Sequence, residues 1–427
     1  MSLVIDAHST EVEPTVAPLI EGSDSLSMDS TESTMEITIQ AMSGSGTALD
    51  PFLIATAADL QAIGTGIYTF SSHYLQVADI DWATHSNEFF TTIGGTIYFT
   101  IFSGTYDGNG FSIHNLKITG TSEYIALFGY PEGATLKNIN FVNAQITGQN
   151  YCAILAGRAG LNTIIKNCTA TGTVTGTGQY VGGLVGLSST CYMEYCNANC
   201  TVQGSKSVGG IVGHMQTTSK CYRCYSSGSV VVTGTTALGG GFVGALLGTC
   251  SLVECYSISN ISGIGYRTGG LVGNTSDLSI VQDCYAMGTV HTDTAETSHS
   301  GGLIGTSFGP HVRNSYSTGA PTGTSTTKGG LRGYAAYTAG TCYWDKETSG
   351  MTGTTGSGTG KTTLEMYNLA TYVNWPMQLK SELRSALWSI DASYPKHAFK
   401  HILQPINLLS ATSDGTKVRL LWELGGA

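Results

Sequence analysis

The sequence predicts an all-β protein, a parallel β-helix (solenoid) of about eight or nine coils with short helical end caps. Three observations predict it. A glycine motif returns about every 29 residues through the middle of the chain, and a motif built on cysteine and tyrosine returns between its copies at the same interval. The composition agrees, because 57 glycines, 41% hydrophobic residues and only 11% charged residues are typical of repetitive β-structure.

The glycine motif reads Gly-Gly-apolar-apolar-Gly. One coil cannot bury its own inner face, so repeats of this kind must stack on one another. A four-stranded propeller blade needs ~40–45 residues, which is longer than the observed period. Coils ~4.8 Å apart then make a rod roughly 40 Å long. The copies begin at Gly182, Gly209, Gly240, Gly269, Gly301 and, in a weaker form, Gly329.

The second motif places a cysteine at the same point of successive coils. Positions two residues later hold Ala or Ser, and positions six residues later hold mostly Val. Even offsets share one face of a strand, so all three columns are expected to face the core. We call the six cysteines of this column the cysteine ladder and expect them to be buried, mostly reduced and packed as small hydrophobic residues. The ladder consists of Cys168, Cys196, Cys224, Cys255, Cys284 and Cys342.

A second cysteine column, formed by Cys191, Cys221 and Cys250, recurs at intervals of 30 and 29 residues. Stacked Cα atoms ~4.8 Å apart fall within the range that a disulfide accepts, so disulfides and free thiols are equally open for this column. No cofactor and no metal site is expected. Only the Cys221 and Cys224 pair has metal-ligand spacing, and no second pair matches it.

The residue that follows the ladder position is tyrosine in five coils. If the ladder points into the core, these tyrosines point outward and form a stacked aromatic column, which we call the tyrosine stripe. Tyrosine combines apolar area with a polar tip, and clustered exposed aromatic residues usually mark an interaction site. We expect the stripe to bind a glycan or a partner chain. The alternatives are that loops of the same chain cover it or that the rings simply stack across coils. The stripe consists of Tyr225, Tyr256, Tyr285, Tyr316 and Tyr343.

Both motifs resemble the GLUG-type repeats of bacterial surface and secreted proteins. The resemblance covers about residues 46–400, with further similar segments at 46–54, 77–82, 104–110 and 343–350. It implies a right-handed parallel β-helix and a surface setting. It implies no particular activity, because such helices carry adhesins, enzymes and virion spikes alike.

The motifs divide the chain into five parts. They are an acidic N-terminal arm for attachment or assembly (1–45), a cap ahead of the repeats (46–100), the β-helix repeats (101–345), a linker with a C-terminal cap (346–400) and a C-terminal strand or tail (401–427). We expect a short helix over 57–64 and another over 363–370, because open coil ends are exposed sheet edges that need covers. The tail alternates like a hairpin strand, whose partner we place in this chain or in a neighbouring one.

Charge and hydropathy exclude two classes of partner. The formal net charge is −10 and no basic run occurs, so nucleic acid is not expected to bind. No stretch of ~18 apolar residues occurs, so no membrane span is expected. The first residues lack the basic and apolar regions of a secretory signal, which indicates either a removed leader or a protein released by lysis.

These observations predict a structural and adhesive subunit of a virion appendage, such as a phage tail fibre, spike or decoration protein, located on the extracellular virion. We expect it to bind other virion or surface-assembly subunits through residues 1–45 and to form a homo-oligomer, with a trimer as one arrangement. A host surface glycan is a further expected partner. The alternative is a secreted bacterial or archaeal cell-surface adhesin module.

A polysaccharide depolymerase is the second alternative. Glu254 and Asp283 precede the ladder on adjacent coils, and a pair of carboxylates facing one groove is what glycoside cleavage requires. Asparagine fills the same position at Asn138, Asn167 and Asn314, which favours a turn. We therefore assign no catalytic residue.

Overall fold

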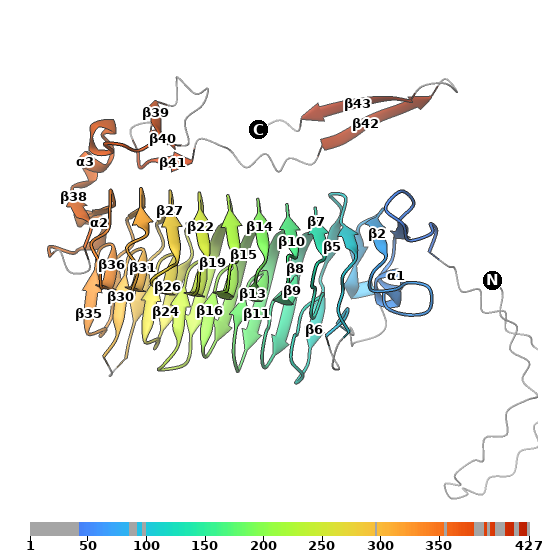
Figure 1. Cartoon of the computed structure of the whole chain (residues 1–427), viewed down its shortest axis with the longest axis horizontal. Coiled ribbons are helices and arrows are strands. Elements are labelled where there is room, and N and C mark those ends of the chain that lie inside the picture. Colours follow the sequence, from blue (N-terminus) through green and yellow to red (C-terminus); the bar gives the residue numbers. More distant parts are fainter. Residues whose placement is uncertain are drawn as a thin grey trace, which may run out of the picture. The chain divides into compact units, whose positions relative to one another are not determined.

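The computed structural model describes residues 42–84, 92–95, 100–294, 297–353, 357–379, 388–390, 393–397, 406–413 and 418–424. The described part of the chain is a β-solenoid of about nine turns in which parallel strands stack coil on coil (Figure 1). The predicted fold class is confirmed. The N-terminal arm predicted over 1–45 lies outside the described residues except for its last four positions.

Each central coil contains four strands. In one coil these are β18 (Lys220–Tyr222), β19 (Tyr225–Val232), β20 (Leu238–Gly240) and β21 (Val243–Leu246). Each strand pairs in parallel with the equivalent strand of the next coil, so residues about 29 positions apart become lateral neighbours. The molecule therefore consists of columns of equivalent residues.

The first strands of the coils form a ten-stranded sheet. Its members are β1 (Phe52–Ile54), β2 (His73–Gln76), β4 (Thr105–Asp107), β7 (Thr135–Lys137), β10 (Ile164–Lys166), β14 (Tyr192–Glu194), β18, β22 (Ser251–Val253), β27 (Ile280–Gln282) and β32 (Val312–Arg313).

The second strands form a fifteen-stranded sheet, in which some coils contribute two short strands. Its members are β3 (Ile80–Asp81), β5 (Ser112–His114), β6 (Lys117–Thr119), β8 (Asn140–Gly148), β11 (Thr169–Gly176), β15 (Asn197–Gly204), β19, β23 (Tyr256–Ser257), β24 (Asn260–Gly263), β28 (Tyr285–Ala286), β29 (Val290–Thr292), β33 (Tyr316–Ser317), β34 (Pro321–Thr322), β37 (Tyr343–Asp345) and β38 (Thr359–Lys361).

The third and fourth strands form sheets of six and seven strands. The six are β12 (Val181–Gly182), β16 (Ser207–Gly209), β20, β25 (Arg267–Gly269), β30 (His299–Gly301) and β35 (Thr327–Gly329). The seven are β9 (Ala156–Ala159), β13 (Val185–Ser189), β17 (Val212–Gln216), β21, β26 (Val272–Thr275), β31 (Ile304–Ser307) and β36 (Arg332–Ala335).

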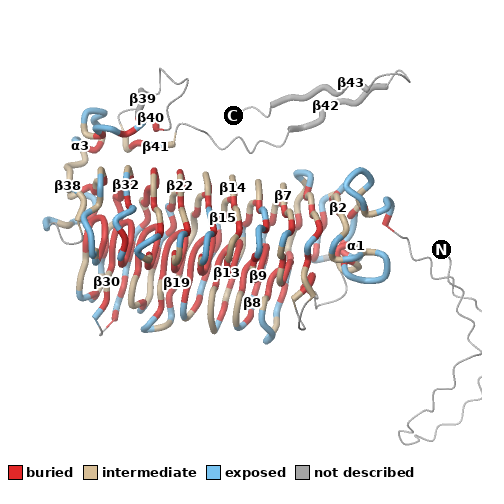
Figure 2. The backbone as a smooth tube through the Cα atoms, in the orientation of Figure 1, coloured by how far each residue is buried: buried red, intermediate tan, exposed pale blue. Residues whose placement is uncertain are grey.

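The core runs along the inside of the coils, where Figure 2 shows the backbone mostly buried. The columns predicted to face inward are buried, as Cys168, Ala170 and Val174 of one coil illustrate. The glycine motif lies where the backbones of neighbouring coils approach closely. A Cβ atom added at Gly210 would lie 2.1 Å from the carbonyl oxygen of Gly241, so no larger residue fits.

The coils extend beyond the predicted repeat boundaries at both ends. Strands β1 and β2 already pair in parallel with each other and with β4, inside the segment predicted as a cap. At the other end, β38 pairs with β37 inside the predicted linker. Sequence similarity between coils is weak in these segments, but main-chain pairing does not depend on it.

The helices are short. Helix α1 (Ala57–Ala62) begins at a capping box formed by Thr56 and Asp59, and ends two residues earlier than predicted. In the second predicted helical segment the structure has α3 (Thr363–Met366) and the 3-10 helix η2 (Leu369–Thr371). Two further helices in the described residues are η1 (Trp82–Thr84) and α2 (Lys346–Ser349). Within the described ranges, no helix has the length and apolar character to span a membrane.

After the coils, β39 (Met377–Leu379), β40 (Trp388–Ile390) and β41 (Lys396–His397) form a small sheet. In the tail, β42 (Ile406–Ser413) and β43 (Val418–Leu424) pair in antiparallel orientation. The predicted tail strand thus finds its partner within the same chain.

The glycine columns generate a first prediction. Gly210→Ala should lower the free energy of unfolding by at least about 2 kcal/mol, because the new Cβ atom meets backbone rather than a movable side chain. The matched control is Gly340→Ala, where the nearest atoms would lie at 3.6 and 3.7 Å, and its effect should stay within about 0.5 kcal/mol. Urea unfolding followed by circular dichroism measures both; equal stabilities of the two variants would contradict the close approach.

Candidate binding site

The tyrosine stripe forms a stacked column along the fifteen-stranded sheet. The ring centroids of Tyr225 and Tyr256 are 4.8 Å apart, and those of Tyr256 and Tyr285 are 4.6 Å apart, with both pairs of rings within 2° of parallel. Tyr316 follows at 5.2 Å, and Tyr343 pairs with Tyr316 in strand register. The five tyrosines are therefore neighbours in space, as the spacing predicted.

The expected exposure of the stripe is wrong at its centre, because a later segment of the same chain covers it. Tyr285 is 5% exposed and Tyr316 is 0% exposed. The Trp388 ring packs against both of them, and the Tyr316 hydroxyl donates a hydrogen bond of 2.6 Å to the carbonyl oxygen of Pro395. Cover by the chain's own segment, the alternative considered above, is thus what the structure shows. The covering cluster contains Met366, Tyr372, Trp375, Trp388 and Ile390.

The cysteine ladder is buried, and its thiols satisfy a specific main-chain group. In five of the coils the thiol donates to the carbonyl oxygen two residues earlier, at 3.1 to 3.4 Å. Ser315 occupies the ladder position in another coil and makes the same hydrogen bond at 2.8 Å. In these six coils a short side chain with a donor thus satisfies the same carbonyl group.

The second cysteine column is buried as well. All eleven cysteines of the chain lie in described segments and carry free thiols, including Cys191, Cys221 and Cys250. The Cys221 thiol lies 3.7 Å from the Met215 sulfur, so the two columns and a thioether form a sulfur-rich interior. Among the described residues, no group of three or more metal-ligating side chains is placed to hold a metal ion.

The residue immediately before the ladder forms a turn with left-handed backbone. Asparagine tolerates this conformation better than other residues with a side chain. Four successive coils nevertheless carry other residues there. Positive φ angles of 46° to 55° occur at Asn138, Asn167, Tyr195, Arg223, Glu254, Asp283 and Asn314.

Three of these unusual turn residues bind one another across the coils. The Arg223 guanidinium donates through Nη1 to the Tyr195 hydroxyl at 2.6 Å and through Nε to Glu254 Oε2 at 2.7 Å. The Tyr222 hydroxyl donates to Glu254 Oε1 at 2.6 Å. The Arg223 guanidinium also lies 4.4 Å from the centre of the Tyr222 ring. The Tyr222 ring is thus fixed both at its hydroxyl and on one face.

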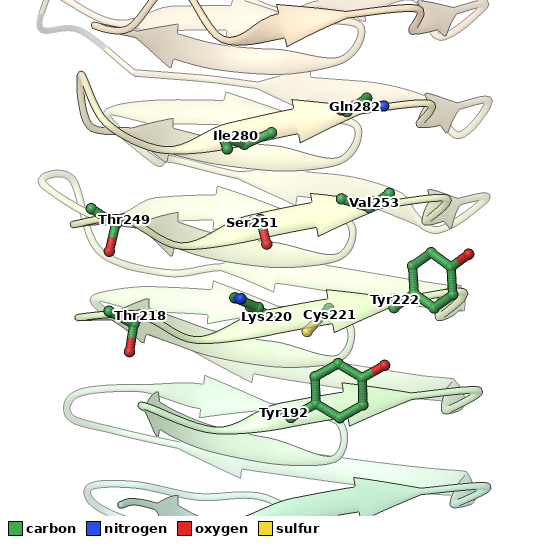
Figure 3. Close-up of a pocket in the computed structure, with 10 residues that line it drawn as sticks. All are labelled: Tyr192, Thr218, Lys220, Cys221, Tyr222, Thr249, Ser251, Val253, Ile280 and Gln282. Carbon is green, nitrogen blue, oxygen red and sulfur yellow. The ribbon is translucent and has the colours of Figure 1, made fainter. Parts of the chain in front are cut away.

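This fixed tyrosine lines a hollow of about 730 Å³ on the outer face of the ten-stranded sheet (Figure 3). Strand register explains the hollow, because β22 carries the short side chains of Ser251 and Val253 at positions where the paired strands β18 and β27 carry longer ones. Figure 3 shows the rings of Tyr192 and Tyr222 on adjacent coils, with Lys220 on the same strand as Tyr222. The lining includes Tyr192, Thr218, Lys220, Tyr222, Thr249 and Gln282.

Some of the charged side chains around the hollow form ion pairs and one does not. Glu194 pairs with Lys166 at 3.1 Å, and Glu254 pairs with Arg223. Lys220 is exposed and has no ion pair within the described part of the chain. Burial and the neighbouring Glu194 carboxylate raise the pKa of Tyr192 to about 12, so this phenol stays a neutral hydrogen-bond donor at physiological pH. The hollow therefore offers one uncompensated ammonium beside two aromatic rings.

Sequence reasoning did not find this hollow. Glu254 and Asp283 replace asparagine in the turn column, and the sequence favoured a turn there, with a catalytic acid pair as the alternative. In the structure the Glu254 carboxylate is bonded to Tyr222 and Arg223, and the Asp283 carboxylate accepts from Gln282 Nε2 at 2.7 Å. The feature of the sequence that indicates the hollow is that four successive coils carry a residue other than asparagine at the turn position.

Comparison with the known protein families gives no match, so membership of the GLUG-type group stays a prediction. Halomucin of Haloquadratum walsbyi is 29% identical over 248 residues, which is 56% of this chain and 3% of halomucin. An immunoglobulin A1 protease of Streptococcus pneumoniae is 26% identical over 186 residues, which is 41% of this chain and 9% of that protein. The chain thus spans less than a tenth of the length of either relative.

Among solved structures, a candidate immunoglobulin A1 protease from Bacteroides ovatus aligns with a TM-score of 0.53. The alignment covers 83% of this chain and 94% of that chain at 22% sequence identity. At this identity the likeness supports the β-solenoid fold and nothing more.

The buried thiols generate a prediction about alkaline pH. Burial raises the pKa of Cys152, Cys191, Cys200 and Cys342 to about 12 and that of Cys250 to about 11. Unfolded thiols titrate near ~8.5, so above that pH the unfolded state releases protons that the folded state keeps. Stability should be complete below about pH 8 and fall by about 1.4 kcal/mol per thiol and pH unit between about 9 and 11.

Urea unfolding at pH 7, 8, 9 and 10 measures this slope. The matched variant is Cys191→Ala, which removes one buried thiol, so its stability should fall less steeply with pH than that of the unmodified chain, by about one proton. A stability that is flat across this range would show that the thiols titrate normally in the folded state.

The covered stripe generates a prediction about packing. Tyr316→Ala should lower the free energy of unfolding by about 3 kcal/mol or more, because it removes a fully buried ring together with its bond to Pro395. Tyr225→Ala, at the half-buried end of the same stripe, should cost clearly less. Limited proteolysis should also cut the 362–397 segment faster in the Tyr316 variant, and equal losses for both variants would contradict the covering role.

Proposed function

We propose that the chain is an extracellular β-solenoid module of a surface-displayed protein, with a structural and adhesive role. The observation that carries the proposal is the hollow on a face built from ten in-register strands. Because every coil is bonded to its neighbours, side chains on this face hold fixed spacings without help from loops. Such a face suits recognition of a ligand outside the cell.

The names of the relatives favour a surface or secreted setting. Halomucin is named as a mucin, and an immunoglobulin A1 protease is named for an antibody, which is an extracellular protein. A virion appendage would use the same rigid module and stays the second setting. Residues 1–45 as an attachment arm, and assembly into a homo-oligomer, belong to the proposal in either setting.

A binding role is favoured over proteolysis or polysaccharide cleavage. The matched segment is 9% of the pneumococcal protease, so the name of that enzyme describes a much longer protein. The carboxylates of Glu254 and Asp283, which the depolymerase alternative would use, are bonded to Tyr222, Arg223 and Gln282.

Antibodies against the folded solenoid, applied to intact cells of the source organism, test the setting. We expect labelling without permeabilisation and loss of the label after brief protease treatment of the cells, while a cytosolic marker stays intact. Labelling that needs lysed cells would overturn the cell-surface setting. Co-sedimentation of the chain with particles from a cell-free lysate would favour the virion setting instead.

A further inference from the structure

We propose that the hollow on the ten-stranded sheet binds a carboxylated saccharide, with the sugar ring packed against Tyr222 and Tyr192 and the carboxylate at Lys220. This inference rests on the proposed function and names the ligand class of its binding face. It replaces the tyrosine stripe as the glycan-binding surface, since the centre of that stripe is covered.

The shape and chemistry of the hollow fit a sugar. A volume of about 730 Å³ lies within the range of small-ligand sites, which is roughly 300–1,000 Å³. A pyranose has an apolar C–H face and a rim of hydroxyl groups, so it needs a flat aromatic surface with polar groups around it. Tyr192 and Tyr222 supply the rings, and Thr218, Thr249 and Ser251 supply hydroxyl groups around them.

The principal ring is positioned before any ligand arrives. Its hydroxyl is bonded to Glu254 and one face lies against the Arg223 guanidinium, so Tyr222 has little freedom to lose on binding. Glu254 is itself only 7% exposed, which keeps this network rigid. A preorganised aromatic anchor is what a weak and highly hydrated ligand such as a sugar requires.

The turn column supplies an independent argument. Left-handed backbone at a residue other than glycine or asparagine costs roughly 1–3 kcal/mol, and such strain persists mainly at functional sites. Left-handed backbone occurs next to the hollow in three successive coils, at Tyr195, Arg223 and Glu254. Asparagine at Asn138, Asn167 and Asn314 shows that the fold alone needs no such residues.

Charge complementarity decides for an acidic sugar over a neutral one. Glu194 and Glu254 beside the hollow are paired with cations, and Asp283 accepts hydrogen bonds from Gln282 and Trp388. The Lys220 ammonium has no ion pair within the described residues. The chain as a whole carries a net charge of −10, so an uncompensated cation in a hollow is a local feature that the composition does not explain. A carboxylate on the ligand would complete this arrangement.

Calorimetric titration of the full chain tests the ligand class. The probes are trigalacturonate, a hyaluronan hexasaccharide and sialyllactose, each compared with its carboxyl-reduced form. We expect at least one acid to bind and its reduced form to bind at least about tenfold more weakly, with affinity falling as salt is added. If none of the three acids binds at millimolar concentration, or if the reduced forms bind equally well, the proposal is overturned.

Two variants test the residues. Lys220→Met keeps the length of the side chain and should weaken binding of the acid about tenfold or more, whereas Lys206→Met, an exposed lysine elsewhere, should leave it unchanged. The double variant Arg223→Asn with Glu254→Asn restores asparagine at two turns, so it should remain as stable as the unmodified chain and still bind about tenfold more weakly. Unchanged binding in the double variant would overturn the role of the network.

The result of the sugar-binding test can be distinguished from the result of the cell-labelling test of the proposed function. Binding of a purified chain to a sugar does not depend on where the chain resides, and labelling of intact cells does not depend on sugar binding. A surface-exposed chain that ignores all three acids would overturn only the ligand class.

Discussion

The structure depends on one constraint, which is that equivalent residues of successive coils must meet at the spacing of hydrogen-bonded parallel strands, ~4.8 Å. The glycine columns show how tight this contact is. A Cβ atom added at Gly183 would lie 2.2 Å from the carbonyl oxygen of Gly210. The motif therefore recurs because the coils touch there, and not because these glycines need positive φ angles, which neither of them has.

The same constraint explains why the fold was predictable from the sequence. Every column repeats one requirement, so a residue that meets the requirement in another way still reveals the column. Ser315 in the cysteine ladder is the clearest case, since its hydroxyl bonds the same carbonyl group as the thiols do. Even offsets from the ladder then identified the inward faces, because strand alternation is local and needs no knowledge of the rest of the chain.

What lies on the outside of the coils was less predictable, for two physical reasons. The cover over Tyr285 and Tyr316 comes from Trp388, which is far along the sequence and carries no repeat. The hollow depends on differences in side-chain length between paired residues of neighbouring coils, such as Ser251 beside Lys220. An alignment of the repeats shows what the coils have in common and does not reveal such differences. The sequence repeat identifies the residues that the coils have in common. A binding site arises where the side chains of one coil differ from those of the others.

The turn residues that differ from asparagine are connected through hydrogen bonds to the rest of the molecule. Asp283, the last of the four unusual turn residues, accepts a hydrogen bond from Gln282 at the edge of the hollow and one of 3.4 Å from the Trp388 indole nitrogen. Gln282 accepts in turn from Arg313 on the following coil. A single buried carboxylate thus links the wall of the hollow to the segment that covers the tyrosine stripe. The residues of these turns therefore contribute to both features, Glu254 to the hollow and Asp283 to the cover.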